Sequence, residues 1–152
     1  MKAEDLMSGD WVHSISTIHN VSFPDNGVIQ DEGYTTIRKP IKITTVSENC
    51  VSYYSNKLEI YITVSNEEIE PIQLTPEILE KNGFKTEFYS DYKVYELNNF
   101  KVCKSYCDYF EVCDLWKDSD FGWEIISFCP CIYVHQLQHA LRLCGINKEI
   151  MV

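Results

Sequence analysis

The sequence predicts an α+β protein, with a small β-barrel-like N-terminal half followed by a helix, an antiparallel meander and a second helix. Short runs rich in β-branched and aromatic residues fill most of the chain and are separated by Asn, Asp, Gly and Ser. Two segments instead carry helix signals, "LTPEILEKNGF" and "YVHQLQHALRLCG". We expect a β-rich subdomain over residues 1–73 and an α+β subdomain over residues 74–152, either separate or packed as one unit.

The first half contains several strand signals with short turns between them. The segments "GDWVHSIS" and "EIYITVS" are expected to be strands, and "KPIKITTVSENCVSYYS" is typical of a hairpin that turns at Glu48 and Asn49. Residues 19–38 are rich in Gly, Asn, Asp and Pro, which predicts a long loop or an extra hairpin. Short strands with close turns favour a small barrel or a curled sheet.

A short helix after residue 74 has the clearest local signal in the chain. Thr75 is a favoured N-cap residue, and Pro76 fits the first helical position, where its missing N–H is not needed. Leu74 and Leu79 occupy the two positions of a hydrophobic staple. Gly83 is expected to end the helix in the left-handed conformation.

The rest of the second half predicts a meander closed by a helix. Asp91, Asn98-Asn99, Ser105 and "KDSD" separate five strand-like runs. These runs are "FKTEFYS", "YKVYEL", "NFKVCK", "YCDYFEVCDLW" and "GWEIISFC". The last helix is expected from Ile132 to Leu143, with Gly145 after it.

Composition limits the classes of function. The chain of 152 residues has a formal net charge of -10, which disfavours direct binding to nucleic acids or to anionic membranes. The first residues lack the basic and apolar regions of a signal peptide, and seven cysteines without an export signal favour reduced thiols. We therefore expect a cytoplasmic protein, with a basic protein surface as its possible partner; the oligomeric state stays open.

The stretch "CPCIYVHQLQHALRLCG" suggests a metal site. His135 and His139 are four residues apart and share a helix face, and Cys129 and Cys131 are the nearest further donors. Their spacing does not match the zinc-finger patterns, in which a longer loop separates thiolates from imidazoles. The simpler interpretation is two half-exposed histidines opposite an apolar stripe, with two small buried thiols.

No catalytic or cofactor-binding motif occurs in the sequence. There is no G-x-S-x-G, no glycine-rich phosphate loop and no C-x-x-C, so we expect no cofactor. Cys103, Cys107 and Cys113 are better explained as scattered thiols of a sheet core.

Aromatic residues in the first half are candidate contact residues. Small barrels sometimes bind peptides through exposed aromatics, and Trp11, Tyr53, Tyr54 and Tyr61 lie in the predicted strands. Tyr53 and Tyr54 are adjacent, so in a strand they face opposite ways and one of them is expected to be exposed. The ordinary alternative is that such residues fill a core or make cross-strand pairs.

Four segments carry a resemblance: "LMSGDWV", "KPIKITTV", "IEPIQLTPEILEKNGF" and "YVHQLQHALRLCG". Together they resemble a group of small uncharacterised proteins from gut-associated bacteria and their prophage-like elements. The resemblance covers most of the chain except residues 19–39 and part of the meander. It implies a shared origin and fold, and it provides no catalytic residues.

These observations favour a non-enzymatic binding or interaction protein, an accessory product of a bacterial mobile element. One specific form is an acidic decoy, whose carboxylates occupy a basic partner in place of phosphates. Two alternatives stay open. One is a metal-binding protein built around His135, His139 and the nearby cysteines, and the other is an enzyme whose site is assembled from distant residues.

Overall fold

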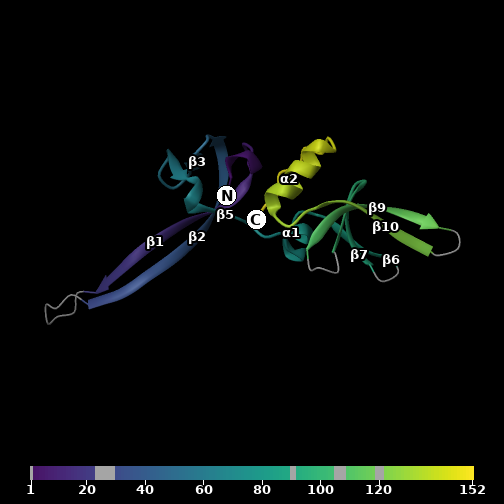
Figure 1. Ribbon diagram of the computed structural model, residues 1–152, viewed down its shortest axis with the longest axis horizontal. Helices are drawn as coiled ribbons and strands as arrows, with labels where there is room; N and C mark the ends of the chain where they lie inside the picture. Colours follow the sequence, from purple (N-terminus) through teal and green to yellow (C-terminus); the bar gives the residue numbers. More distant parts are fainter. Residues whose placement is uncertain (1, 23–29, 90–91, 105–108, 119–121) are drawn as a thin grey trace. The chain divides into compact units, whose positions relative to one another are not determined.

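The computed structural model describes residues 2–22, 30–89, 92–104, 109–118 and 122–152. The chain divides into two compact units, Met1–Pro71 and Ile72–Val152, at a point two residues before the boundary expected from the sequence. Each unit contains one five-stranded antiparallel sheet, and the second also contains both α-helices (Figure 1). The α+β class is therefore confirmed.

The first unit is built on an open sheet with the strand order β4-β3-β2-β1-β5. Its elements are η1 (Ala3–Asp5), β1 (Trp11–Ser22), β2 (Gln30–Val46), β3 (Cys50–Ser55), β4 (Ile60–Ser65), η2 (Asn66–Glu68) and β5 (Ile69–Pro71). Among the described strands β4 and β5 form the two edges and do not pair with each other, so the expected barrel-like arrangement is not found. Closure fails because β5 has only three residues, while β1 and β2 run far beyond it.

The region expected to be a loop or an extra hairpin is mostly strand. β1 and β2 pair continuously from Trp11 opposite Lys42 to Ser22 opposite Gln30, with one register shift beyond His19. The turn that joins them, residues 23–29, lies outside the described residues. Near the shift Gly33 has φ +83° in β2, which is typical of a β-bulge that starts with a left-handed glycine. The extra hairpin was thus the correct alternative.

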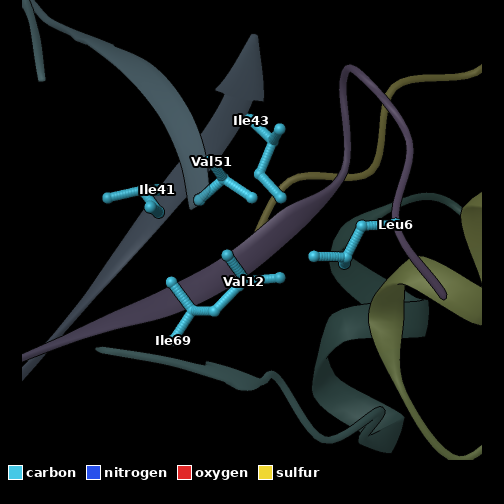
Figure 2. Packing of buried hydrophobic residues seen from close by; sticks show 6 residues of the cluster. All are labelled: Leu6, Val12, Ile41, Ile43, Val51 and Ile69. Atoms are coloured by element: carbon cyan, nitrogen blue, oxygen red, sulfur yellow. The ribbon is translucent and has the colours of Figure 1, made fainter. Parts of the chain in front are cut away.

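The core of the first unit gathers at one end of this hairpin. Six aliphatic side chains from β1, β2, β3, β5 and the N-terminal turn point toward one another (Figure 2): Leu6, Val12, Ile41, Ile43, Val51 and Ile69. Val46, Tyr53 and Val64 pack against them. The expected alternation in the second strand is confirmed, because Ile41 and Ile43 are buried and Lys42 is not.

A buried carboxylate joins the N-terminal turn to this core. Asp10 is fully buried, and its Oδ2 accepts a hydrogen bond of 2.7 Å from the backbone N–H of Met7. The backbone of Ile43 donates to the Asp10 carbonyl and accepts from the N–H of Gly9. The turn before β1 is therefore fastened to β2, and Leu6 is held in the core.

The second unit contains a meander with strand order β10-β9-β8-β7-β6, so every strand pairs with its neighbour in sequence. Its elements are α1 (Pro76–Lys81), β6 (Lys85–Tyr89), β7 (Tyr92–Leu97), β8 (Phe100–Lys104), β9 (Phe110–Asp118), β10 (Gly122–Pro130) and α2 (Val134–Leu143). In the described part of the chain, no helix has both the length and the apolarity needed to cross a bilayer.

The first helix has the caps that its sequence predicts. The Thr75 hydroxyl accepts a hydrogen bond from the Ile78 N–H at 3.4 Å, and Pro76 is the first helical residue. Gly83 has φ +77°, and the Phe84 N–H returns to the Leu79 carbonyl. The Phe84 ring then packs edge-to-face on Phe100 of β8. Both ends of this helix are confirmed.

The second helix is joined to the segment that precedes the first. The N–H of Leu74 donates to Ile132, and the N–H of Val134 donates to Ile72. Gln136 caps the start of α2, because its Oε1 accepts from the N–H groups of Ile132 and Tyr133 at 2.8 and 3.1 Å. These bonds hold the starts of both helices side by side.

Asn82 fastens the last residues of the chain to α1. Its side-chain amide donates to the carbonyls of Ile78 and Met151 at 2.7 and 2.8 Å, and its Oδ1 accepts from the Met151 N–H at 2.8 Å. Asn82 is 2% exposed, so these bonds are shielded from water. They place Ile150 in the core with no exposed surface.

We predict that Asn82→Ala destabilises the protein by about 2–3 kcal/mol, because it removes three hydrogen bonds and leaves part-buried backbone groups of Met151 and Ile78 with fewer partners. Thermal and urea unfolding followed by circular dichroism measure this loss. Asn99→Ala, at an exposed turn position, is the matched control. Equal stability of the two variants would contradict a role of the Asn82 hydrogen bonds in stability.

Candidate functional site

The most unusual surface of the described chain is the outer part of the β1–β2 hairpin. We call residues 16–22 and 30–37 the arm. Figure 1 shows these two strands running side by side away from β3 and β5 of the same unit. Its described side chains include three large apolar ones that are strongly exposed: Ile18 at 46%, Tyr34 at 72% and Ile37 at 44%. The buried cluster of the first unit, which reaches Val12 and Ile41, does not extend into this part of the hairpin.

The register shows why the apolar side chains of the arm lie where they do. Ile18 is opposite Thr35 and Ser16 is opposite Ile37, so Ile18 and Ile37 lie on the face that carries the buried Val12 and Ile41. The apolar stripe of the core thus continues outward past the last residues that could cover it. Tyr34, being next to Thr35, belongs to the opposite face.

The two edges of the arm are not covered by other described strands. β3 pairs with β2 only from Ile43 onward, and β5 pairs with β1 only at Val12–Ser14. Proteins usually protect such edges, because an uncovered edge can pair with another chain. The arm therefore offers strand edges as well as apolar side chains.

An ion pair lies at the base of the arm, directly after residue 37 of β2. The guanidinium of Arg38 forms an ion pair with Glu70 of β5, and His13 Nδ1 lies 3.8 Å from the same carboxylate. This ion pair links β2 to β5 across β1. Lys39 is exposed beside it. Glu70 balances the charge of Arg38, so Lys39 adds one positive charge here in a chain whose net charge is -10.

The aromatic candidates are distributed over the body of the first unit. Tyr54 is 42% exposed and makes an edge-to-face pair with Tyr61 of β4, with ring centroids 5.2 Å apart. Tyr53 packs on the core instead, so the expected opposite orientation of Tyr53 and Tyr54 is confirmed. Trp11 is half-buried opposite Lys42 at the start of β1. Binding by these aromatics stays a prediction.

The structure brings the two histidines of the proposed metal site together on α2, as expected, but it buries one of them. His135 is buried at 5% exposure and its ring stacks on Tyr133, whereas we expected it on an exposed face. His139 is half-buried, with its ring edge-to-face to His135 at 5.9 Å. The buried face of α2 is wider than the predicted apolar stripe, because it also includes His135 and Gln138.

The two cysteines of that stretch differ in environment. Cys129 is exposed at the end of β10, after a register shift, whereas Cys131 is 1% exposed. Burial raises the pKa of Cys131 to about 12, which favours the thiol over the thiolate that a metal requires. Among the residues with a described position, no three His, Cys, Asp or Glu side chains form a group that could hold a metal ion.

A pair of thiols lies on one face of the second sheet. Cys103 and Cys113 are both buried, as expected for a sheet core, and they pack with Val94. The hydrogen bond between the two thiols lowers the pKa of Cys103 and, together with burial, raises that of Cys113. Ser127, next to them, donates to Glu111 at 2.7 Å. Cys107, the third of these predicted thiols, lies outside the described residues.

Among the open clefts on the described surface, one lies in the first unit and another in the second. The first has a volume of about 690 Å³ and is lined by Lys2, Glu4, Glu48, Asn49, Ser65, Asn66 and Glu67. The second, of about 480 Å³, is lined by Gly83, Lys85, Glu87, Glu96, Leu97 and Asn98. Neither lining contains a histidine or a cysteine, and the Ser65 hydroxyl already caps η2 by accepting from Glu67. These clefts do not assemble a nucleophile with a base.

Comparison with known proteins gives no relative: no family model, curated protein sequence or solved structure matches the chain.

We predict that the buried Cys131 thiol makes stability fall with rising pH above about 9. Its pKa is raised to about 12 in the folded state from 9.0, so in this interval the folded chain keeps a proton that the unfolded chain has lost. Stability then falls by about 1.4 kcal/mol per pH unit from this group. Urea unfolding at several pH values should show a smaller fall for Cys131→Ala than for the wild type. Identical slopes would contradict the burial of this thiol.

Proposed function

We propose that this chain is a non-enzymatic protein-interaction module whose contact surface is the arm of the β1–β2 hairpin. The observation that carries the proposal is the exposure of Ile18, Tyr34 and Ile37 on a two-stranded ribbon whose edges no other described strand covers. The origin in a bacterial mobile element is part of the proposal and rests on the resemblance of the Gly-Asp-Trp-Val start and the two helix segments alone.

The physical argument concerns what the arm does for its own fold. An isolated two-stranded hairpin is at best marginally stable in water, because it has no second layer to cover its apolar side chains. The arm adds little to the core, which ends at Val12 and Ile41. Its exposed isoleucines and its edges gain contacts only when another chain covers them. Such binding by strand addition combines backbone hydrogen bonds with side-chain contacts on alternate positions.

Site-specific photo-crosslinking tests this surface. Benzoyl-phenylalanine in place of Tyr34 should capture one protein species of defined mass in producing cells. The same probe in place of Phe88, which is equally exposed at 72% but lies in β6 of the second unit, is the control. We expect the adduct at Tyr34 to disappear when Ile18→Ser and Ile37→Ser are introduced. Equal adducts from both probe positions would contradict the arm as the contact surface.

The acidic decoy is the second candidate, and the cleft of the first unit favours it. Glu4, Glu48 and Glu67 line this cleft from three different segments, so some of the acids do gather on one side of the unit. Glu68, next in sequence, accepts from the Ser65 N–H at 3.0 Å and so keeps η2 folded. A basic partner would meet several carboxylates at once here, and their attraction would weaken with salt.

Calorimetric titration with an oligolysine peptide at low ionic strength tests the decoy. We expect Glu48→Lys with Glu67→Lys to weaken binding by about tenfold or more, because close carboxylates act together on one cation cluster. Glu87→Lys with Glu96→Lys, in the cleft of the second unit, changes the net charge equally and should have a much smaller effect. Equal losses would show that only net charge matters and would exclude a dedicated acidic site.

A further inference from the structure

We propose that Cys103 and Cys113 form a redox-sensitive pair in the second unit, which a hydroperoxide converts into a reversible disulfide. Cys103 lies in β8 and Cys113 in the neighbouring strand β9. Both thiols are free and buried, at 2% and 5% exposure, and they pack in one cluster with Val94. The pair belongs to the second unit, so this inference is independent of the function proposed for the arm.

The strand register puts the two thiols on one face of the sheet. Cys103 is opposite Glu111, and Cys113 follows Glu111 by two residues, so both cysteines share a face. Val102 and Tyr95, which are paired with each other and buried, belong to the opposite face. The thiols are therefore diagonal neighbours on two paired strands, a position from which side chains reach each other.

The contact between the two thiols is asymmetric. The hydrogen bond between them lowers the pKa of Cys103 and, together with burial, raises that of Cys113. Ser127, opposite Cys113 in β10, also lowers the pKa of Cys103 through a hydrogen bond, whereas burial and the charge of Glu111 raise it. Because the thiolate is the reactive form, Cys103 is the nucleophile and Cys113 is the thiol that reacts second.

The reaction has two steps and needs only hydrogen peroxide as the oxidant. The sulfur of Cys103 attacks one peroxide oxygen, so that an S–O bond forms, the O–O bond breaks, and a sulfenic acid and one water result. The sulfur of Cys113 then attacks the sulfur of Cys103, which forms the S–S bond and breaks the S–O bond. The leaving hydroxide takes the proton of Cys113 as a second water. The dithiol loses two electrons and two protons, and the peroxide accepts them.

The diagonal position makes this disulfide strained and therefore easy to reduce. Diagonal neighbours have Cα atoms about 7–8 Å apart, whereas disulfides usually join Cα atoms about 4.4–6.8 Å apart. Cys103 is the residue before the last of β8, so closing the bond shifts the end of a strand toward β9. Strand ends also open more easily than strand centres, which gives a small peroxide access to the buried thiols. Strained disulfides are typical of reversible sites.

Mass spectrometry of the folded wild-type protein after treatment with hydrogen peroxide tests the pair. The remaining thiols are alkylated, and trypsin separates the two cysteines because Lys104 lies between them. We expect the peptide with Cys103 to be joined to the peptide with Cys113 and to be two hydrogens lighter than the two together. Dithiothreitol should release both peptides. Fragment ions distinguish Cys113 from Cys107, which lies in the same peptide.

Single variants test the separate roles of the two thiols. In Cys113→Ser the reaction should stop at the sulfenic acid of Cys103, which dimedone labels. Cys103→Ser should give neither the linked peptides nor a dimedone label at Cys113. Cys129→Ser, which removes an exposed cysteine of the same unit, is the matched control and should form the link in full. Circular dichroism of each variant confirms that it is folded, and the wild-type measurement needs no variant.

Three results would overturn the inference. The first is a wild type in which Cys103 and Cys113 are still alkylated after the exposed Cys129 and Cys144 have been oxidised. The second is a link from Cys103 to another cysteine in place of Cys113. The third is a dimedone label at Cys113 in the Cys103→Ser variant, because it would make Cys113 a nucleophile in its own right.

Discussion

Among the described residues, the long β1–β2 hairpin has its hydrophobic core contacts at the end that carries Val12 and Ile41, and this constraint governs the first unit. Val12 and Ile41 mark the last core positions, beyond which the strands continue without a second layer. Burial of an aliphatic side chain is worth about 1.5–3 kcal/mol, so the body is fixed by its six side chains while the arm depends on its own ladder. The exposure of Ile18 and Ile37 follows from this.

The second unit is held together in a different way, by strand pairing and by side-chain hydrogen bonds. Its meander pairs every strand with its sequence neighbour, and two side-chain amides fasten segments outside the sheet: the buried Asn82 and the half-buried Gln136. Asn82 binds the backbone of Met151 much as a neighbouring strand would, and Gln136 does the same for the chain before α2. Each amide provides hydrogen-bond partners for part-buried backbone groups. In this unit, side-chain amides form the hydrogen bonds with the backbone that a neighbouring strand would otherwise form.

Sequence patterns predicted local features well and tertiary features poorly. The caps of α1 at Thr75 and Gly83 depend on neighbouring residues only, and the structure has them where expected. The length of β1 and β2 was missed because the Gly, Asn, Asp and Pro of residues 19–38 obscured two β-branched runs, "TIHNVS" and "YTTIRK". The burial of His135 was missed because it depends on what packs against α2, which helical periodicity does not contain. The hydrogen bonds from Asn82 to Met151 had no sequence signal, since the two residues are 69 positions apart.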